Sequence, residues 1–226
     1  MSSATRAPVK RVGHKGAGQL APGNTVASFE AALAAGVDVI EFDVTRHRGR
    51  LVLAHSRLEA RRHQVVPLAA GLAHLSDPRF AHVTFNVDLK RPGYELQTLD
   101  LLQAAGLTDR CLISSQFARS LDRVRRLDPG VRVGISVGGW ISRRRHRWNR
   151  GLTQRLVVAV EAGRFDCLMA HHGLVDADLV TRMTACGAEV YAWTVDSQIL
   201  IERLLLTGVA GITTNDPRLF GARLTA

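Results

Sequence analysis

The sequence has few cysteines, few aromatic residues and fewer acidic than basic side chains. Its 226 residues include three cysteines, 5% aromatic residues and 20 acidic against 30 basic side chains. The cysteines, Cys111, Cys167 and Cys186, show no metal-type spacing, which argues against a structural zinc site and a disulfide framework. Free thiols in a reducing compartment are the expected state, and this favours a cytoplasmic protein.

Long hydrophobic runs are also absent. No stretch of about 18 apolar residues occurs, so we expect no transmembrane helix. Residues 1–8 lack the apolar core of a signal peptide, and we expect them to form a disordered tail. At 46% hydrophobic and 22% charged residues, the chain has the composition of one ordinary globular domain, which we place at residues 9–222.

The charge of the chain is strongly positive, with a formal net charge of +10 at pH 7. Part of it is clustered, in Arg57, Arg61 and Arg62 and more densely over Arg143–Arg150. Such clusters attract phosphates, so peripheral contact of Arg143–Arg150 with an anionic membrane is one interpretation. A solvated surface loop is the other. No RNA- or DNA-binding motif is present, and we expect no specific nucleic-acid partner.

Strand-like and helix-like segments alternate along the chain. Strands are expected at 9–14, 37–43, 83–89, 111–114, 131–135, 165–169, 190–195 and 209–213, with a hairpin strand at 51–55. Helices are expected after residue 24 and around 66–75, 94–105, 117–127, 153–162, 176–186, 198–206 and 217–220. Eight βα units in about 220 residues predict an α/β fold, a single-domain (β/α)₈ TIM barrel.

The stretch Val39–Val44 carries two acids on one strand. Side chains at i and i+2 of a strand share a face, so Glu41 and Asp43 point one way and Ile40 and Phe42 the other. Two crowded carboxylates repel unless a cation lies between them, and hard oxygen ligands suit Mg²⁺, Ca²⁺ or Mn²⁺. The alternative is a strand end whose acids stand in water.

Other polar residues recur where the predicted strands end. In a barrel these ends form one rim, which carries the active site. The rim residues expected from the sequence are His14, Glu41, Asp43, His55, Asp88, Lys90, Ser114, Ser115, Trp193, Asp196 and Thr213–Asp216.

The same residues form motifs that resemble those of the glycerophosphodiester phosphodiesterases, barrel enzymes of the phospholipase-C-like group. That family reads His-Arg-Gly, Pro-Glu-Asn-Thr, Ile-Glu-x-Asp-Val and His-Asp, where this chain has His14-Lys15-Gly16, Pro22-Gly23-Asn24-Thr25, Ile40-Glu41-Phe42-Asp43-Val44 and His55-Ser56. A later Glu-x-Lys, Trp-Thr-Val-Asn and Gly-Ile-x-Thr-Asp-x-Pro are met by Asp88-Leu89-Lys90, Trp193-Thr194-Val195-Asp196 and Gly211-Ile212-Thr213-Thr214-Asn215-Asp216-Pro217.

The resemblance implies a metal-dependent phosphodiesterase acting on glycerophosphodiesters or lysophospholipids. Carried over to this chain, Glu41, Asp43 and Asp88 hold the divalent cation, and His14 and His55 are the catalytic acid and base, in an order that the sequence leaves open. Lys15 and Lys90 contact the substrate phosphate, and Trp193 offers an apolar wall to the alcohol or packs in the core.

The chain also departs from the family pattern. Lys15 stands for an arginine, Gly23 for a glutamate, Ser56 for an aspartate and Asp88 for a glutamate. Only 32 residues separate His55 from Asp88, where the family usually carries a small inserted subdomain. We expect that subdomain to be shortened and the mouth of the barrel to be open, which suits a bulky or lipid-like diester.

Two other functions are compatible with these residues. One is a metal-independent, cyclising phospholipase-C-like enzyme, against which three facing carboxylates argue, because without a cation they would repel one another. The other is a non-catalytic barrel that binds anions through its basic surface.

Overall fold

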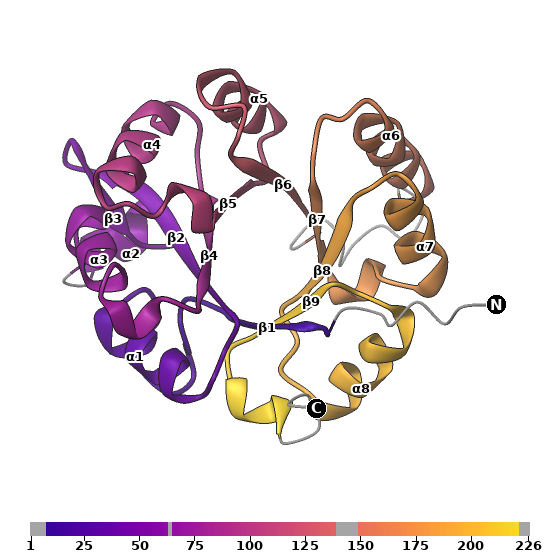
Figure 1. Cartoon of the computed structure of the whole chain (residues 1–226), viewed down its shortest axis with the longest axis horizontal. Coiled ribbons are helices and arrows are strands. Elements are labelled where there is room, and N and C mark those ends of the chain that lie inside the picture. Colours follow the sequence, from indigo (N-terminus) through magenta and orange to yellow (C-terminus); the bar gives the residue numbers. More distant parts are fainter. Residues whose placement is uncertain (1–7, 63–64, 139–148, 222–226) are drawn as a thin grey trace.

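The computed structural model describes residues 8–62, 65–138 and 149–221. Figure 1 shows a ring of strands enclosed by helices, with the N- and C-terminal parts of the ring side by side. The expected tail at residues 1–8 and most of the Arg143–Arg150 cluster lie outside the described residues. Their predicted disorder and membrane contact therefore stay predictions.

Eight parallel strands close the barrel within the described part of the chain. Each pairs with its neighbours in chain order, and β1 pairs with both β2 and β9, which completes the ring. The predicted (β/α)₈ TIM barrel is confirmed. The strands are β1 (Lys10–Gly13), β2 (Val39–His47), β4 (Thr84–Leu89), β5 (Cys111–Ser115), β6 (Arg132–Val137), β7 (Cys167–His171), β8 (Glu189–Trp193) and β9 (Gly211–Thr214).

The helices cover the outer face of this ring. They are α1 (Val26–Ala34), α2 (Arg57–Arg62), α3 (Leu68–Leu75), α4 (Glu95–Ala104), α5 (Ala118–Leu127), α6 (Asn149–Glu161), α7 (Ala177–Ala185) and α8 (Gln198–Thr207). Short 3₁₀ turns follow as η1 (Pro78–Phe80), η2 (Thr108–Arg110), η4 (His172–Leu174) and η5 (Pro217–Phe220). The closing helix predicted at 217–220 is thus a 3₁₀ turn, because Pro217 and the Asp216 cap favour one tight turn there.

The predicted hairpin is present as β3 (Arg50–Leu53), which runs antiparallel to the end of β2. Its two-residue turn has positive φ at both Arg48 (46°) and Gly49 (80°), the geometry of a tight hairpin turn. Apart from residues 63–64, which the structure does not describe, the elements between β3 and β4 are α2, α3 and η1. The subdomain expected there is accordingly shortened.

Two apolar layers support the barrel. The outer layer lies between strands and helices, where Phe42 packs between Phe29 and Phe85 at ring-centroid distances of 5.7 and 6.5 Å. A smaller cluster fills the inside, made of Val12, Val39, Cys167, Met169 and Tyr191. Alternation along β2 sends Ile40 and Phe42 outward, so Val39, Glu41 and Asp43 share the inner face.

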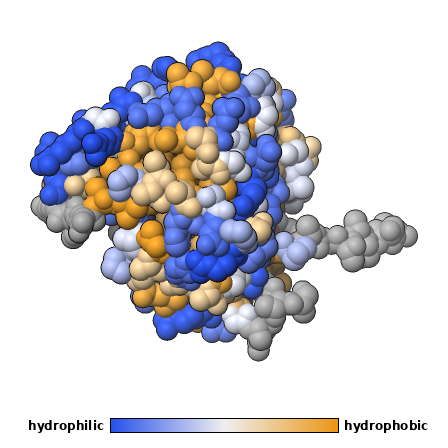
Figure 2. Space-filling model, turned by 60° about the vertical axis from the view of Figure 1, so that its left-hand side comes forward, coloured by the Kyte–Doolittle hydropathy of each residue, from blue (hydrophilic) through white to orange (hydrophobic). Residues whose placement is uncertain are grey.

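The surface mixes polar and apolar residues. Figure 2 turns forward the side that carries α1 to α4, where hydrophobic and hydrophilic areas alternate. Within the described residues, no helix combines the length and the apolar character that crossing a bilayer requires. Cys111, Cys167 and Cys186 are free thiols, the first two buried and the third partly exposed.

Candidate active site

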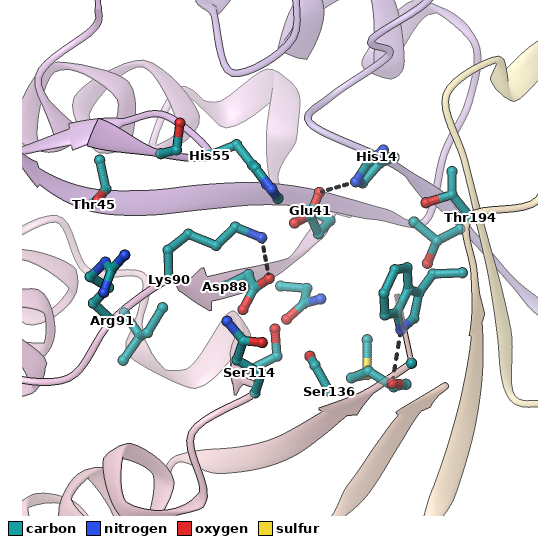
Figure 3. Close-up of a pocket in the computed structure, with 18 of the residues that line it drawn as sticks. His14, Glu41, Thr45, His55, Asp88, Lys90, Arg91, Ser114, Ser136 and Thr194 are labelled. Atoms are coloured by element: carbon teal, nitrogen blue, oxygen red, sulfur yellow. Dashed lines mark hydrogen bonds and ion pairs between the residues drawn. The ribbon is translucent and has the colours of Figure 1, made fainter. Parts of the chain in front are cut away.

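A cavity of about 450 Å³ opens at the carboxyl ends of the strands. Figure 3 shows side chains from β2, β4, β5, β6 and the loop after β1 pointing into it. The residues that line it include His14, Glu41, His55, Arg57, Asn86, Asp88, Lys90, Arg91, Ser114, Gln116, Ser136, Met169 and Trp193. Of the rim residues predicted from the sequence, this cavity is lined by His14, Glu41, His55, Asp88, Lys90, Ser114, Trp193 and Thr213, but not by Asp43, Ser115, Asp196 or Thr214–Asp216.

Three acids come together at this end of β2 and β4. The strands pair in register, with Glu41 beside Asn86 and Asp43 beside Asp88. One oxygen from each of Glu41, Asp43 and Asp88 lies within 4.8 Å of the others. Glu41 is 5% exposed and Asp43 fully buried, so the alternative of acids standing in water does not hold. A set of carboxylate oxygens this close fits one hard divalent cation.

Burial and nearby charges shift the pKa values of Glu41 and Asp43, the two acids of β2, in opposite directions. Burial, together with the charge of Asp43, raises the pKa of Glu41 well above its usual value. Burial alone would also raise the pKa of Asp43, but the Lys90 ammonium, a hydrogen bond from His55 and the charge of Lys15 outweigh it and hold that pKa well below normal. Without a metal ion, Glu41 therefore retains a proton more readily than Asp43.

Both predicted lysines lie close to the acids. Lys90 Nζ is 2.5 Å from Asp43 Oδ1 and 2.5 Å from Asp88 Oδ2, and it lines the cavity. Lys15 Nζ is 3.7 Å from Asp43 Oδ2, and the Lys15 backbone N–H donates to Glu41 Oε2 at 2.8 Å. Lys15 does not line the cavity. Its ammonium points toward Asp43 and not into the open space of the cavity.

Asn24 holds the buried acid of β2, a contact that sequence reasoning missed. Its side-chain amide donates to Asp43 Oδ2 and accepts from the Asp43 backbone N–H, both at 2.9 Å. Asn24 adopts a left-handed φ of 61°, a conformation that asparagine tolerates better than most residues. The cap of α1 is the neighbouring Thr25. A Cβ at Gly23 would lie 3.0 Å from Lys15 Cβ, so the lysine side chain packs over the glycine.

His14 is fixed by a chain of hydrogen bonds from Asn215, which follows the neighbouring strand β9, and Asp196, which follows β8. Asp196 Oδ2 accepts from the Asn215 side-chain N–H at 2.6 Å and Asp196 Oδ1 accepts from the Asn215 backbone N–H at 2.8 Å. A carboxylate only accepts, so this orients the amide, and Asn215 Oδ1 lies 2.6 Å from His14 Nδ1. His14 Nδ1 therefore carries a hydrogen, and Nε2, 3.9 Å from Glu41 Oε2, faces the acids.

His55 is held by Asp43 of β2. Its Nδ1 lies 3.3 Å from Asp43 Oδ2, and its side chain is 55% exposed. Ser56 Oγ accepts from the Glu59 backbone N–H, and Glu59 accepts from the His55 backbone N–H at 3.0 Å. Ser56 thus caps the start of α2 at Arg57. The family motif has an aspartate where this chain has Ser56, and here Asp43 orients the His55 imidazole instead.

Trp193 forms one wall of the cavity. Its indole N–H donates to the Met169 carbonyl at 2.8 Å, and its ring meets His171 edge-on at 5.7 Å between centroids. The side chain is held at both its polar end and its face. It can therefore present a fixed apolar surface to a ligand.

Sequence reasoning also missed a cavity residue within a strand that it had predicted, at 83–89. Asn86 lies two residues before Asp88 on β4, and its buried side-chain oxygen has no hydrogen-bond partner. The period-two pattern of β4 could have identified it. Arg57 and Arg91 also line the cavity, but loop and short-helix positions carry no such periodicity.

The fold and the cavity together define the class of protein to which this chain belongs. A closed parallel barrel with its acids, imidazoles and lysine gathered at the carboxyl ends of the strands has the layout of a barrel enzyme. The family follows from comparison: the glycerophosphoryl diester phosphodiesterase family matches residues 14–71 and 80–219. The chain belongs to this family, and is by family a phosphoric diester hydrolase.

Known relatives span nearly the whole chain. A glycerophosphodiester phosphodiesterase of Caldanaerobacter subterraneus subsp. tengcongensis is 24% identical, over 91% of this chain and 93% of its own. A structure of the Parabacteroides distasonis glycerophosphodiester phosphodiesterase superposes with a TM-score of 0.79 at 18% identity, covering 96% and 97% of the two chains. An Oleispira antarctica phosphodiesterase in complex with the product sn-glycerol-3-phosphate reaches 0.76 at 20% identity, covering 97% and 98%.

Proposed function

We propose that this protein hydrolyses glycerophosphodiesters or lysophospholipids with a divalent cation and two histidines. The products would be an alcohol and glycerol 3-phosphate, or the corresponding lysophosphatidic product. Family membership supports the reaction class, and the three clustered acids support the cation. The Oleispira antarctica relative binds sn-glycerol-3-phosphate as product, which favours a small substrate of the same kind here.

Glu41, Asp43 and Asp88 would hold the cation, which when bound would supply positive charge against the negative charge of the phosphate. The fit rests on their oxygens, all carboxylate and all within 4.8 Å of one another. Mg²⁺, Ca²⁺ and Mn²⁺ all accept such ligands. Asn24 would keep Asp43 oriented through its two hydrogen bonds.

Lys90 would meet the phosphate once the acids are neutralised. In the metal-free arrangement its ammonium bridges Asp43 and Asp88. Burial alone would lower the pKa of Lys90, but the three acids outweigh burial and raise it, so the side chain stays charged. If the acids held a cation, the Lys90 ammonium would no longer be bound between Asp43 and Asp88 and would be available to the phosphate oxygens. Lys15, 3.7 Å from Asp43, would add a second positive charge behind it.

His14 would act as the base. Its Nδ1–H is committed to Asn215 Oδ1, which leaves Nε2 as the nitrogen with a lone pair. Burial lowers the pKa of His14 and outweighs the hydrogen bond to Asn215 and the charge of Asp43, which raise it, while the charges of Lys15 and Lys90 lower it further; the shift favours the neutral imidazole. A neutral imidazole can take the proton of the attacking water or of the substrate's 2-hydroxyl.

His55 would act as the acid. The Asp43 carboxylate lies 3.3 Å from its Nδ1 and fixes the orientation of the ring. The ring is half exposed at the mouth of the cavity, where a departing alcohol would leave. Its other nitrogen can therefore hand a proton to the leaving alkoxide. Trp193 would supply the apolar wall for that alcohol group.

The observation that carries this proposal is the meeting of three acids, two of them buried, with a lysine and two histidines at the carboxyl ends of the strands. The direct test is alcohol release from a panel of glycerophosphodiesters and lysophospholipids, with and without each metal, for the wild type and His14→Ala. We expect metal-dependent release, and a loss of about 10²- to 10⁴-fold in the variant.

The same assay separates the competing functions. Release that survives EDTA and yields a cyclic phosphate would instead identify the metal-independent, cyclising enzyme. No release from any diester, combined with salt-sensitive binding of anionic vesicles, would identify the non-catalytic anion-binding barrel.

A further inference from the structure

A second cavity, of about 700 Å³, lies beside the first, and the described residues that line it are Arg46, His47, Arg48, Gly49, Arg57 and Arg61. We call it the basic cavity. Its residues come from the end of β2, the hairpin turn and α2. The turn presents Arg48 because both of its central residues, Arg48 and Gly49, adopt positive φ. Arg57 lines both cavities, so the basic cavity adjoins the mouth of the candidate active site.

The positive charges of this cavity are not neutralised by the protein. Among the described residues, Arg48, Arg57 and Arg61 form no ion pair. The acid of α2, Glu59, accepts a hydrogen bond from the His55 backbone and does not line the cavity. Arg46 is held in place by Gln97, at 3.2 Å, and by the Tyr94 ring, at 5.7 Å.

The arginine-rich composition alone does not explain this cluster, because arginines elsewhere find acids. Pairs with N–O distances of 2.6 to 2.9 Å join Arg11 to Asp38, Arg79 to Glu30, Arg125 to Asp166, Arg132 to Glu189, Arg164 to Asp122 and Arg218 to Asp216. Arg48, Arg57 and Arg61 are exposed, so water screens their mutual repulsion and their guanidinium groups are free to pair with an anion that enters the hollow. The planar guanidinium fork matches phosphate oxygens.

We propose that the alcohol part of the substrate carries a second phosphate group, which the basic cavity binds while the scissile diester lies in the first cavity. This inference rests on the proposed function and narrows its substrate class. The shared wall at Arg57 makes one ligand spanning both cavities the simplest occupant. A concave hollow beside the active site suits a compact phosphate better than the flat face of a membrane. The second phosphate can be a terminal monoester or a further diester along a polyanionic chain.

The test compares a plain glycerophosphodiester with two derivatives that carry an added phosphate on the alcohol. In one derivative that phosphate is a monoester, and in the other it is a methyl diester. For each protein variant, the readout is the ratio of kcat/KM with and without that phosphate. We expect the wild type to favour the phosphorylated substrates by about tenfold or more. Arg48→Glu/Arg61→Glu should bring the ratio to about one. Arg50→Glu is the matched control, since this residue lies in the same hairpin but does not line the basic cavity.

Each outcome has a distinct meaning. Hydrolysis of the plain diester with no preference for the phosphorylated ones would overturn this inference and leave the proposed function standing. If no diester is hydrolysed, the proposed function fails, and calorimetric titration with inorganic pyrophosphate then tests the cavity alone. Binding that is lost in the double variant but kept in Arg50→Glu would support the phosphate site, and equal binding in all three would contradict it. Binding of anionic phospholipid vesicles that the double variant loses, without any substrate preference, would assign the cavity to a membrane surface and overturn the proposal.

Discussion

The two ends of the barrel interior both carry ionisable side chains, but they balance them differently. At the amino ends of the strands, Glu189 is contacted by two cations, Arg132 at 2.6 Å and Lys10 at 3.6 Å, and by the Tyr191 hydroxyl at 3.1 Å. At the carboxyl ends, three acids face two ammonium groups: Lys90 lies 2.5 Å from Asp43 and Asp88, and Lys15 lies 3.7 Å from Asp43. The first end has more positive partners than acids, and the second has an excess of acids.

Burial and space separate the two ends further. Lys10, Arg132 and Glu189 keep a third or more of their side chains exposed, and the hollow beside them measures about 90 Å³. Asp43 is fully buried beside a cavity of about 450 Å³. Burial alone would raise the pKa of Glu189, but Arg132 and Lys10 outweigh it and lower that pKa. The acids at the carboxyl ends therefore mark a ligand site because their charge is largely buried, unbalanced and next to open space.

The largest expected effect comes from neutralising one acid at each end. Glu41→Gln keeps the size of the side chain but removes a cation ligand, so kcat/KM should fall by about 10²- to 10³-fold or more. Glu189→Gln makes the same chemical change at the amino ends of the strands. It should leave kcat/KM within about threefold and cost about 1 kcal/mol of stability, because its partners are partly solvated. Alcohol release and urea unfolding measure the two effects, and similar losses of activity in both variants would remove the distinction between the ends.

A smaller effect is expected from the hydrogen-bond chain behind His14. Asp196→Asn can present an amide N–H to Asn215 and lets the Asn215 side chain turn over, so His14 loses its fixed tautomer. We expect kcat to fall by about 10- to 100-fold, with little change in KM. Asp176→Asn is a matched control, since Asp176 caps α7 and asparagine caps helices equally well. Nitrogen-15 NMR of the His14 ring reports the tautomer directly, and an unchanged tautomer in Asp196→Asn would refute the role given to this chain.

The smallest expected effect is the pH dependence of metal binding. The pKa of Glu41 is raised in the metal-free protein, and a cation binds only the ionised carboxylate. Binding therefore releases the Glu41 proton, and affinity should rise with pH, by up to about tenfold per unit, until that pKa is passed. Above it the affinity should level off. Calorimetric titration with Mn²⁺ at several pH values measures this, and an affinity that is flat with pH would show that Glu41 is already ionised.

Much of this arrangement was predictable from the sequence. The alternation of Ile40 and Phe42 with Glu41 and Asp43 follows from strand geometry, so the inner face of β2 and the barrel itself could be predicted. The contacts that complete the site could not. Asn24 and Asp43 meet only because the loop takes a left-handed turn, and His14 and Asn215 meet only when β1 and β9 close the ring.

The placement of Lys15 and the contacts at the hairpin show why local sequence patterns were insufficient to predict every side-chain position in the site. The motif position of Lys15 predicts contact with the phosphate, and it gives no sign that the side chain packs over Gly23 with its ammonium 3.7 Å from Asp43. Arg57 and Arg61 were recognised as a basic group, but their meeting with Arg48 depends on where α2 crosses the hairpin. Strand periodicity fixes the direction of a side chain, whereas loops and short helices take theirs from tertiary packing.

The most direct test of the account is whether the three acids hold one cation. Metal-free protein should bind Mn²⁺ at one site in calorimetric titration, detected without any substrate. Asp43→Asn should abolish that binding, while Glu189→Gln should retain it with unchanged stoichiometry. Equal Mn²⁺ binding by the wild type and by folded Asp43→Asn would contradict the central claim that Glu41, Asp43 and Asp88 form the metal site.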